Sequence, residues 1–227
     1  MSGFGVLVVA IVIWLGLHIG VSGTRLRERV VAATGEARFR AAFSVASIGA
    51  LALLIIGYRF APTVQLWLIP AVLGWVLVLL VLPAFCLFVA SVATRNPTAV
   101  GAGGAAGEPR GIVRVTRHPM LWSFAIWAFV HVIGPGDVAS VLFFGTFLVT
   151  AIAGMPSIDA KLARRDPGDW VRLAAVTSIL PGVAIAAGRN RFAVQEIGWI
   201  VPVIGVVAWA VLLWLHPTLF GVRPIPA

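Results

Sequence analysis

Long runs of apolar residues, separated by short polar connections, follow one another along the whole chain. An α-helix needs about 20 largely apolar residues to cross a hydrocarbon core about 30 Å thick. The runs that meet or approach this length are Phe4–Ser22, Ala41–Tyr58, Leu66–Ala93, Pro119–Gly134, Val138–Pro156 and Val194–Leu215. The pattern predicts an all-α polytopic membrane helical bundle of about six transmembrane spans, forming a single integral membrane domain over residues 1–227.

One further apolar stretch, Leu173–Gly188, is too short to cross a bilayer comfortably. The Pro181-Gly182 pair interrupts it, and a proline inside a helix removes a hydrogen bond and clashes with the preceding turn. We expect this stretch to be re-entrant or interfacial.

Composition supports a membrane protein over a soluble one. Of the 227 residues, 60% are hydrophobic and 11% are charged, whereas soluble proteins carry about 25% charged residues. The formal net charge of +9 does not indicate nucleic-acid binding, because the basic residues lie beside the apolar runs. All of them except Arg59 and Arg223 fall after the first, third and fifth spans, so both termini are predicted to face away from the cytoplasm.

The acidic residues are all expected in connections or at span ends, with Asp159 placed just after the fifth span. A bilayer interior without a carboxylate makes ion-coupled transport a weak hypothesis, since a cation there needs fixed negative charge. Asp137 is expected to cap the helix of the fifth span, where its carboxylate accepts unpaired backbone N–H groups.

Four histidines are the other ionisable groups within or beside the spans: His18, His118, His131 and His216. A neutral imidazole can ligate haem iron, although it can equally well hydrogen-bond a neighbouring helix. His118 and His131 are about 20 Å apart along one helix, so they cannot ligate the same iron. Their expected depths favour the pairs His18 with His118 and His131 with His216.

The segment Arg117-His118-Pro119 opens the fourth span. Proline is well tolerated in the first turn of a helix, where its missing N–H costs nothing. Arg117 and His118 then lie at the membrane–water boundary, where they either meet an anionic head group or cofactor, or serve only as an interfacial anchor.

Several ordered motifs resemble those of the NnrU family, which also includes a plastid 15-cis-ζ-carotene isomerase. They are Leu17-His18 with Ser22-Gly23 and Arg25, Gly35–Arg40, Asn96–Gly101, Arg117-His118-Pro119, Trp127 with His131 and Gly136-Asp137, and Gly188-Arg189. The resemblance covers about residues 4–191 and leaves 194–215 as an additional C-terminal span.

The resemblance implies a protein of a bacterial-type cytoplasmic (inner) membrane that binds haem b. Carried over to this chain, the iron ligands are His18 and His131, with Arg117 and His118 at the mouth of the site. The implied activity is haem-dependent cis–trans isomerisation of an apolar polyene, or a role in denitrification and nitric oxide metabolism. The isomerase has a cysteine three residues before its second ligand, where this chain has Ala128, so a ligand switch of that kind is not expected.

Two alternatives stay open. Arg-His-Pro at the start of a span is similar to the isoprenylcysteine and phospholipid methyltransferases, which bind S-adenosylmethionine, but Ile158-Asp159 stands where they have an acidic pair. A charged cofactor at a low-dielectric boundary needs fixed partners, which weakens this interpretation. The other alternative is a non-enzymatic membrane assembly protein.

Overall fold

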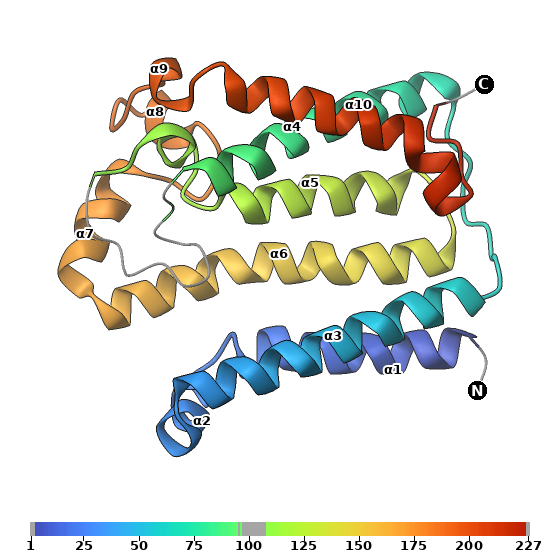
Figure 1. The fold of residues 1–227 in the computed structure, drawn as a ribbon, viewed down its shortest axis with the longest axis horizontal. Helices are drawn as coiled ribbons and strands as arrows, with labels where there is room; N and C mark the ends of the chain where they lie inside the picture. Colours follow the sequence, from blue (N-terminus) through green and yellow to red (C-terminus); the bar gives the residue numbers. More distant parts are fainter. Residues whose placement is uncertain (1–2, 95, 97–107, 226–227) are drawn as a thin grey trace. The chain divides into compact units, whose positions relative to one another are not determined.

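The computed structural model describes residues 3–94, 96 and 108–225 (Figure 1), so most of the Asn96–Gly101 motif lies outside the described residues. The chain divides into two compact units. The first unit comprises Met1–Ile69 and His131–Ser157, and the second comprises Pro70–Val130 and Ile158–Ala227.

Helices make up most of the described structure. Those long and apolar enough to cross a membrane are Gly3–Val21 (α1, Gly3–Leu15, continued by the π-helix η1, Gly16–Val21), α3 (Glu36–Phe60), α4 (Ala71–Ala93), α6 (Val138–Arg165) and α10 (Ile200–Phe220). A shorter apolar helix, α5, spans Pro119–Ile133. The remaining elements are α2 (Leu26–Thr34), η2 (Gly111–Arg114), α7 (Pro167–Val176), α8 (Val183–Ala186) and α9 (Val194–Ile197). The prediction of an all-α polytopic membrane protein is confirmed.

Several span boundaries differ from the predicted ones. Leu66–Ile69 is not helical, and α4 begins only after Pro70, because a proline disfavours helix in the residue before it. The fifth span does not end at Pro156 but continues as α6 to Arg165, and Asp166 then caps α7 ahead of Pro167. The predicted last span Val194–Leu215 is a short helix α9 followed by α10.

The stretch Leu173–Gly188 is broken, as its Pro-Gly pair predicts. Helix α7 ends at Val176, Gly182 adopts a left-handed conformation, and α8 covers only Val183–Ala186. No continuous helix of membrane-crossing length runs through this described stretch.

In the first unit, α1 and α3 lie side by side in close contact (Figure 1). A Cβ atom built on Gly57 of α3 lies 2.6 Å from the backbone nitrogen of Leu7 in α1. Leu7 and Leu54 are completely buried beside this approach. Small residues let membrane helices approach until their backbones touch, and here hydrogen at position 57 is what permits the contact.

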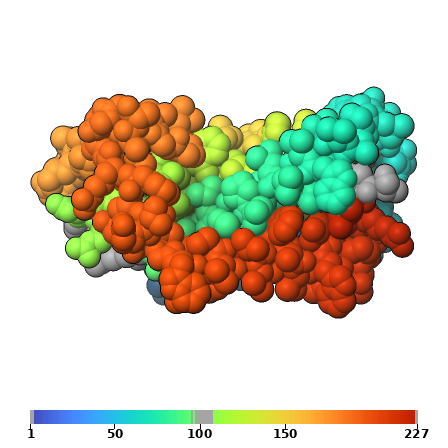
Figure 2. All heavy atoms as spheres, turned by 90° about the horizontal axis from the view of Figure 1, so that it is seen from above, coloured from blue at the N-terminus to red at the C-terminus, as the bar shows by residue number. Residues whose placement is uncertain are grey.

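In the second unit, α10 packs along α4, where Figure 2 shows the two helices next to each other. A Cβ on Gly205 of α10 comes within 2.9 Å of the Cα of Cys86 in α4. One turn further on, the indole N–H of Trp209 donates to the carbonyl of Val78 at 3.1 Å. An interhelical hydrogen bond to a backbone carbonyl adds direction to a contact that is otherwise only van der Waals packing.

Replacing Gly57 by leucine is expected to separate α1 from α3, because the contacting atoms are backbone and cannot move aside. Overpacking of this kind costs about 3 kcal/mol. The measurement is the thermal unfolding temperature of the detergent-solubilised protein. Gly49→Leu on the same helix is the matched control, since a Cβ there meets nothing within 4 Å; an equal loss in both variants contradicts the interpretation.

Candidate functional site

A buried network of ionisable side chains joins the start of α5 to the last turns of α6 in the second unit. Asp159 accepts hydrogen bonds from Nε of Arg117 at 2.9 and 3.1 Å, and it lies 2.8 Å from Nε2 of His118. A further contact joins Nη2 of Arg117 to Asp159 Oδ2 at 2.8 Å. The exposed fractions are 9% for Arg117, 1% for His118 and 7% for Asp159, so the three side chains form one desolvated cluster.

Asp159 was not among the site residues predicted from the sequence. The acidic residues were expected in connections or at span ends, with Asp159 just after the fifth span. In the structure α6 continues to Arg165, so Asp159 lies within its last turns, on a buried helix face. A signal was present in the spacing: Asp159 follows Met155 by four residues, Leu162 follows Asp159 by three, and helical periodicity puts the three on one face. Lys161, Arg164 and Arg165 obscured that signal by marking the segment as polar.

The irregular segment between α7 and α8 holds the Arg-His-Pro segment in place. The backbone N–H of Arg117 donates to the carbonyl of Ser178 at 3.1 Å, and Gly182 N–H donates to Val115 at 2.8 Å. The carbonyl of Ile179 accepts from the hydroxyl of Thr116 at 2.7 Å and from the indole of Trp122 at 2.8 Å. Non-helical backbone is tolerated in a membrane protein when protein groups satisfy it, which is the case here.

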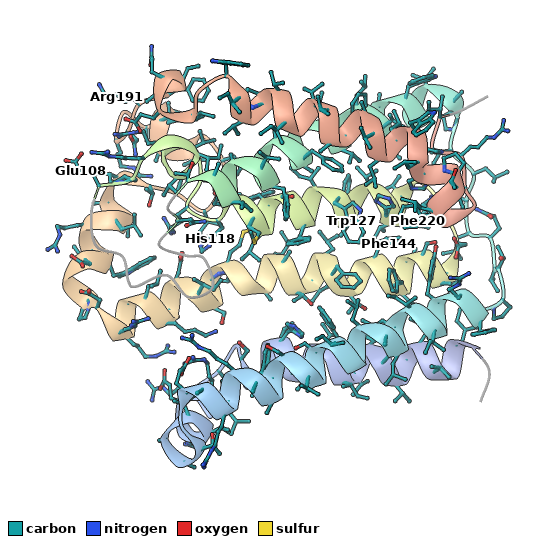
Figure 3. The ribbon with its side chains drawn as sticks, in the orientation of Figure 1. Glu108, His118, Trp127, Phe144, Arg191 and Phe220 are labelled. Atoms are coloured by element: carbon teal, nitrogen blue, oxygen red, sulfur yellow. The ribbon has the colours of Figure 1, made fainter. Side chains whose placement is uncertain are left out.

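His118 lies at the start of α5 (Figure 3) and keeps one ring nitrogen without a partner. Among the described residues, its Nδ1 is buried and makes no hydrogen bond, while Nε2 faces Asp159. A carboxylate beside Nε2 favours the tautomer with the proton on Nε2, which leaves a bare acceptor at Nδ1. Such an imidazole is held ready to accept a proton or a ligand bond. The described residues contain no group of three or more His, Cys, Asp or Glu side chains arranged to hold a metal ion.

Arg117 and His118 were expected at the mouth of a cofactor site. The structure brings them together, but it directs both toward Asp159 and buries them. Asp159 stands where the membrane methyltransferases have an acidic pair, and its bonds to Arg117 and His118 add no support to the methyltransferase alternative.

A second charged cluster lies outside the spans, where α9 meets η2. Glu196 accepts from Nε of Arg114 at 2.8 Å, from Nη2 of Arg114 at 2.9 Å and from the backbone N–H of Gly111 at 2.8 Å. The hydrogen bonds from Arg114, followed by that from Gly111, lower the pKa of Glu196 from 4.5 to about 2. Beside this pair, Ile112 and Val113 of η2 form a buried cluster with Ala90 of α4.

His18 lies in the π-helical turn η1 of the first unit, a type of turn frequently found at functional sites. Its Nδ1 is 3.0 Å from the carbonyl of Trp14, so Nδ1 carries the proton and Nε2 is left as the acceptor. The ring stacks on Trp14 at 3.9 Å and meets the edge of Phe43 at 5.2 Å. This tautomer and orientation suit a metal ligand.

The structure does not bring His18 and His131 together. The ring of His131 packs on that of Phe144 in α6, with the ring centroids 4.8 Å apart. The indole N–H of Trp14 donates to the hydroxyl of Thr150 at 3.0 Å, and Thr150 lies about 9 Å further along α6 than Phe144. His18 lies beyond Trp14 on the way to Gly23, whose carbonyl accepts from Ser157 at 3.0 Å. Two imidazole nitrogens on one metal ion lie about 4 Å apart, so this arrangement does not fit the pair as axial ligands of one haem.

An apolar groove of about 220 Å³ lies between α4 and α5 in the second unit. Its walls are made by Val81, Ala84, Phe85 and Phe88 of α4 and by Ser123, Phe124 and Trp127 of α5. The rings of Phe88 and Phe124 meet edge to face at 6.1 Å. The lining is therefore aromatic and aliphatic, with a single hydroxyl from Ser123.

The helices and these sites define a polytopic helical membrane protein with a buried ion-pair network and an aromatic groove. The sequence matches the family described as NnrU protein over residues 6–224, and the chain belongs to the NnrU family. The match runs past residue 191 and includes α10, so the last span lies within the family region.

One relative is named 15-cis-zeta-carotene isomerase, chloroplastic, from Arabidopsis thaliana. It is 26% identical to this chain over 190 residues, which cover 79% of this chain and 50% of the relative. The chain thus spans about half the length of that protein. No solved structure matches the chain.

Replacing Asp159 by asparagine is expected to destabilise the protein by about 3 kcal/mol, because the buried Arg117 guanidinium then lacks its counter-charge. The double variant Arg117→Met/Asp159→Leu should be less destabilised than Asp159→Asn, since it leaves no buried charge behind. Thermal unfolding in detergent measures both, and a double variant that is at least as unstable as Asp159→Asn overturns this account.

Acid should weaken the contact between α9 and η2. Glu196 has a lowered pKa in the folded protein, so its stabilising contribution is complete above pH 4.5 and is lost as the pH falls toward about 2. The unfolding temperature of the wild type should therefore fall more steeply than that of Glu196→Gln between about pH 5 and about pH 3. Arg114→Gln should flatten the profile in the same way, and unchanged slopes in both variants contradict the assignment.

Proposed function

We propose that this NnrU-family protein binds an extended apolar polyene in the groove between α4 and α5 and isomerises a cis double bond in it. The observation that carries the proposal is the lining of the groove. Phe85 and Phe88 of α4 face Phe124 and Trp127 of α5, so aromatic rings border the groove on both sides.

A conjugated polyene is an apolar rod with a continuous π face, and this groove is complementary to such a molecule. Aromatic rings favour offset-stacked and edge-to-face contacts with other π systems. Phe88 is 41% exposed and Phe124 is 42% exposed, so a ligand dissolved in the bilayer reaches these rings directly from lipid. The groove holds one segment of the polyene while the remainder of the polyene stays in the membrane.

The reaction class comes from the relative named a 15-cis-zeta-carotene isomerase. Because this chain spans about half of that protein, the shared half is proposed to contain the polyene-binding helices. An isomerase neither adds nor removes atoms, which agrees with a groove lined almost wholly by hydrocarbon side chains.

Haem b binding stays a separate proposal. The Nε2 atom of His18 is an acceptor held in place by the bond from Nδ1 to Trp14, and this supports ligation by His18 alone. His131, in α5, packs on Phe144 of α6 and not beside His18, so the proposal does not include a haem held by both residues. The proposed role in nitrogen-oxide metabolism requires a bound haem and applies only if the protein binds one.

The proposed location is a bacterial-type cytoplasmic membrane with both termini away from the cytoplasm. The basic residues after the first, third and fifth spans support this orientation. Under this proposal, the Arg117–His118–Asp159 network and the Arg114–Glu196 pair lie toward the cytoplasmic side.

The test is to incubate the purified protein in lipid vesicles with a polyene that carries a central 15-cis double bond, and to separate the isomers by chromatography. The wild type should form the trans product. Phe88→Ala and Phe124→Ala should each lower the rate about tenfold, the effect of losing somewhat more than 1 kcal/mol of aromatic contact in the transition state.

Phe192→Ala is the matched control, because Phe192 is 60% exposed and does not line the groove. A wild type that forms no trans product overturns the proposed reaction. Product formation that is unaffected by the groove variants overturns the binding site only. An absorption spectrum of the same sample tests haem: a Soret band lost in His18→Ala but kept in His131→Ala supports His18 as the sole essential ligand.

A further inference from the structure

A separate pocket of about 410 Å³ lies in the first unit, whereas the groove proposed for the polyene belongs to the second. The π-helical segment η1, helix α2 and the first turns of α3 form its walls, with Leu17, Val30, Phe39 and Phe43 among the apolar side chains. Arg38 and Thr34 supply its polar lining. The pocket is thus mainly apolar, with a guanidinium at its edge.

The charges around this pocket are unevenly matched. Within residues 25–40 the chain carries five arginines but only Glu28 and Glu36 as acids. Glu36 accepts from Arg27 at 2.6 Å and from Arg40 at 2.9 Å, so one carboxylate is shared by two cations. Arg27 also lies over the ring of Phe39, 5.2 Å from its centroid.

Arg38 takes no part in these ion pairs. It is exposed, it lines the pocket, and it makes no ion pair or side-chain hydrogen bond with any residue in the described part of the chain. A guanidinium presents several donors in a planar fork that matches the geometry of phosphate oxygens. Its position beside an apolar hollow suits a ligand that has an anionic group at one end and hydrocarbon at the other.

The position of the pocket along the chain points to the same kind of ligand. Helix α3 begins at Glu36 and carries one of the spans, so Arg38 lies within its first turn. Head groups occupy the membrane–water boundary at this level, and basic residues beside a span attract anionic lipids. The apolar walls continue from Arg38 into the span as far as Ala46.

We infer that this pocket binds an anionic phospholipid, with an acyl chain against Leu17, Phe39 and Phe43 and the phosphate on Arg38. The geometry requires no rearrangement of Glu36, because Arg27 and Arg40 already neutralise it. The bound lipid ties η1, α2 and α3 together beside the turn that contains His18. This inference does not depend on the proposed isomerase activity, since the two pockets belong to different units.

The test uses the full-length protein purified from membranes that contain both phosphatidylglycerol and phosphatidylcholine, with bound lipid counted by native mass spectrometry. The wild type should retain phosphatidylglycerol in preference to phosphatidylcholine. Arg38→Gln should lower the preference about fivefold, the factor expected for one basic residue at an anionic surface. Ala42→Leu, which fills the pocket from an exposed position on α3, should reduce the retention of both lipids.

Arg29→Gln is the matched control, because Arg29 is also exposed in the same basic segment but does not line the pocket. If Arg29→Gln and Arg38→Gln lower the preference for phosphatidylglycerol equally, the lipid is attracted to the basic surface as a whole, and the proposed site is overturned. Unchanged retention in Ala42→Leu also overturns it, as does a Soret-absorbing porphyrin in place of the lipid. Unfolding temperatures measured after delipidation confirm that the variants fold alike.

Discussion

The packing of the second unit depends on the neutralisation of one carboxylate, that of Asp159, away from water. Asp159 lies in a helix, is almost fully buried, and is stable there as an anion because Arg117 and His118 surround it. Arg117 and His118 precede α5 directly, so the ion pair ties the start of that helix to the end of α6. The segment from Thr177 to Gly182 completes the arrangement, because its carbonyls and N–H groups satisfy the backbone around Arg-His-Pro. Its broken, non-helical form is therefore required rather than incidental.

The residues that the sequence suggested were one site make different contacts in the structure. Of the histidines expected to share an iron, His131 packs on Phe144 of α6, whereas His18 contacts Trp14 and Phe43. Arg117 and His118 belong to a buried network. Two apolar pockets lie in different units, one bordered mainly by aromatic rings and the other bordered by a guanidinium. The two pockets therefore suit different ligands. The first suits a ligand with π faces, and the second suits a ligand in which an anionic group is joined to hydrocarbon.

Most of the helices were predictable because a long apolar run has few alternatives in a bilayer, where every backbone group must be bonded within the segment. The helix start at Pro119, the cap at Asp137 and the break at Pro181-Gly182 were predictable for local reasons. The hydroxyl and N–H of Ser140 do bond the carboxylate of Asp137, as expected. The end of α6 was not predictable in this way, since its last turns are polar and are stabilised by partners distant in sequence.

The sequence by itself therefore determined the class of protein, the approximate spans and the family, because hydrophobic length and ordered local motifs are written along the chain. Only the tertiary structure decided that Asp159 is the partner of Arg117 and His118, 42 and 41 residues away, and that His18 and His131 lie apart. It also decided which arginine of residues 25–40 lines a pocket without a counter-charge. These properties depend on which faces of separate helices meet, and periodicity within one helix does not specify its neighbours.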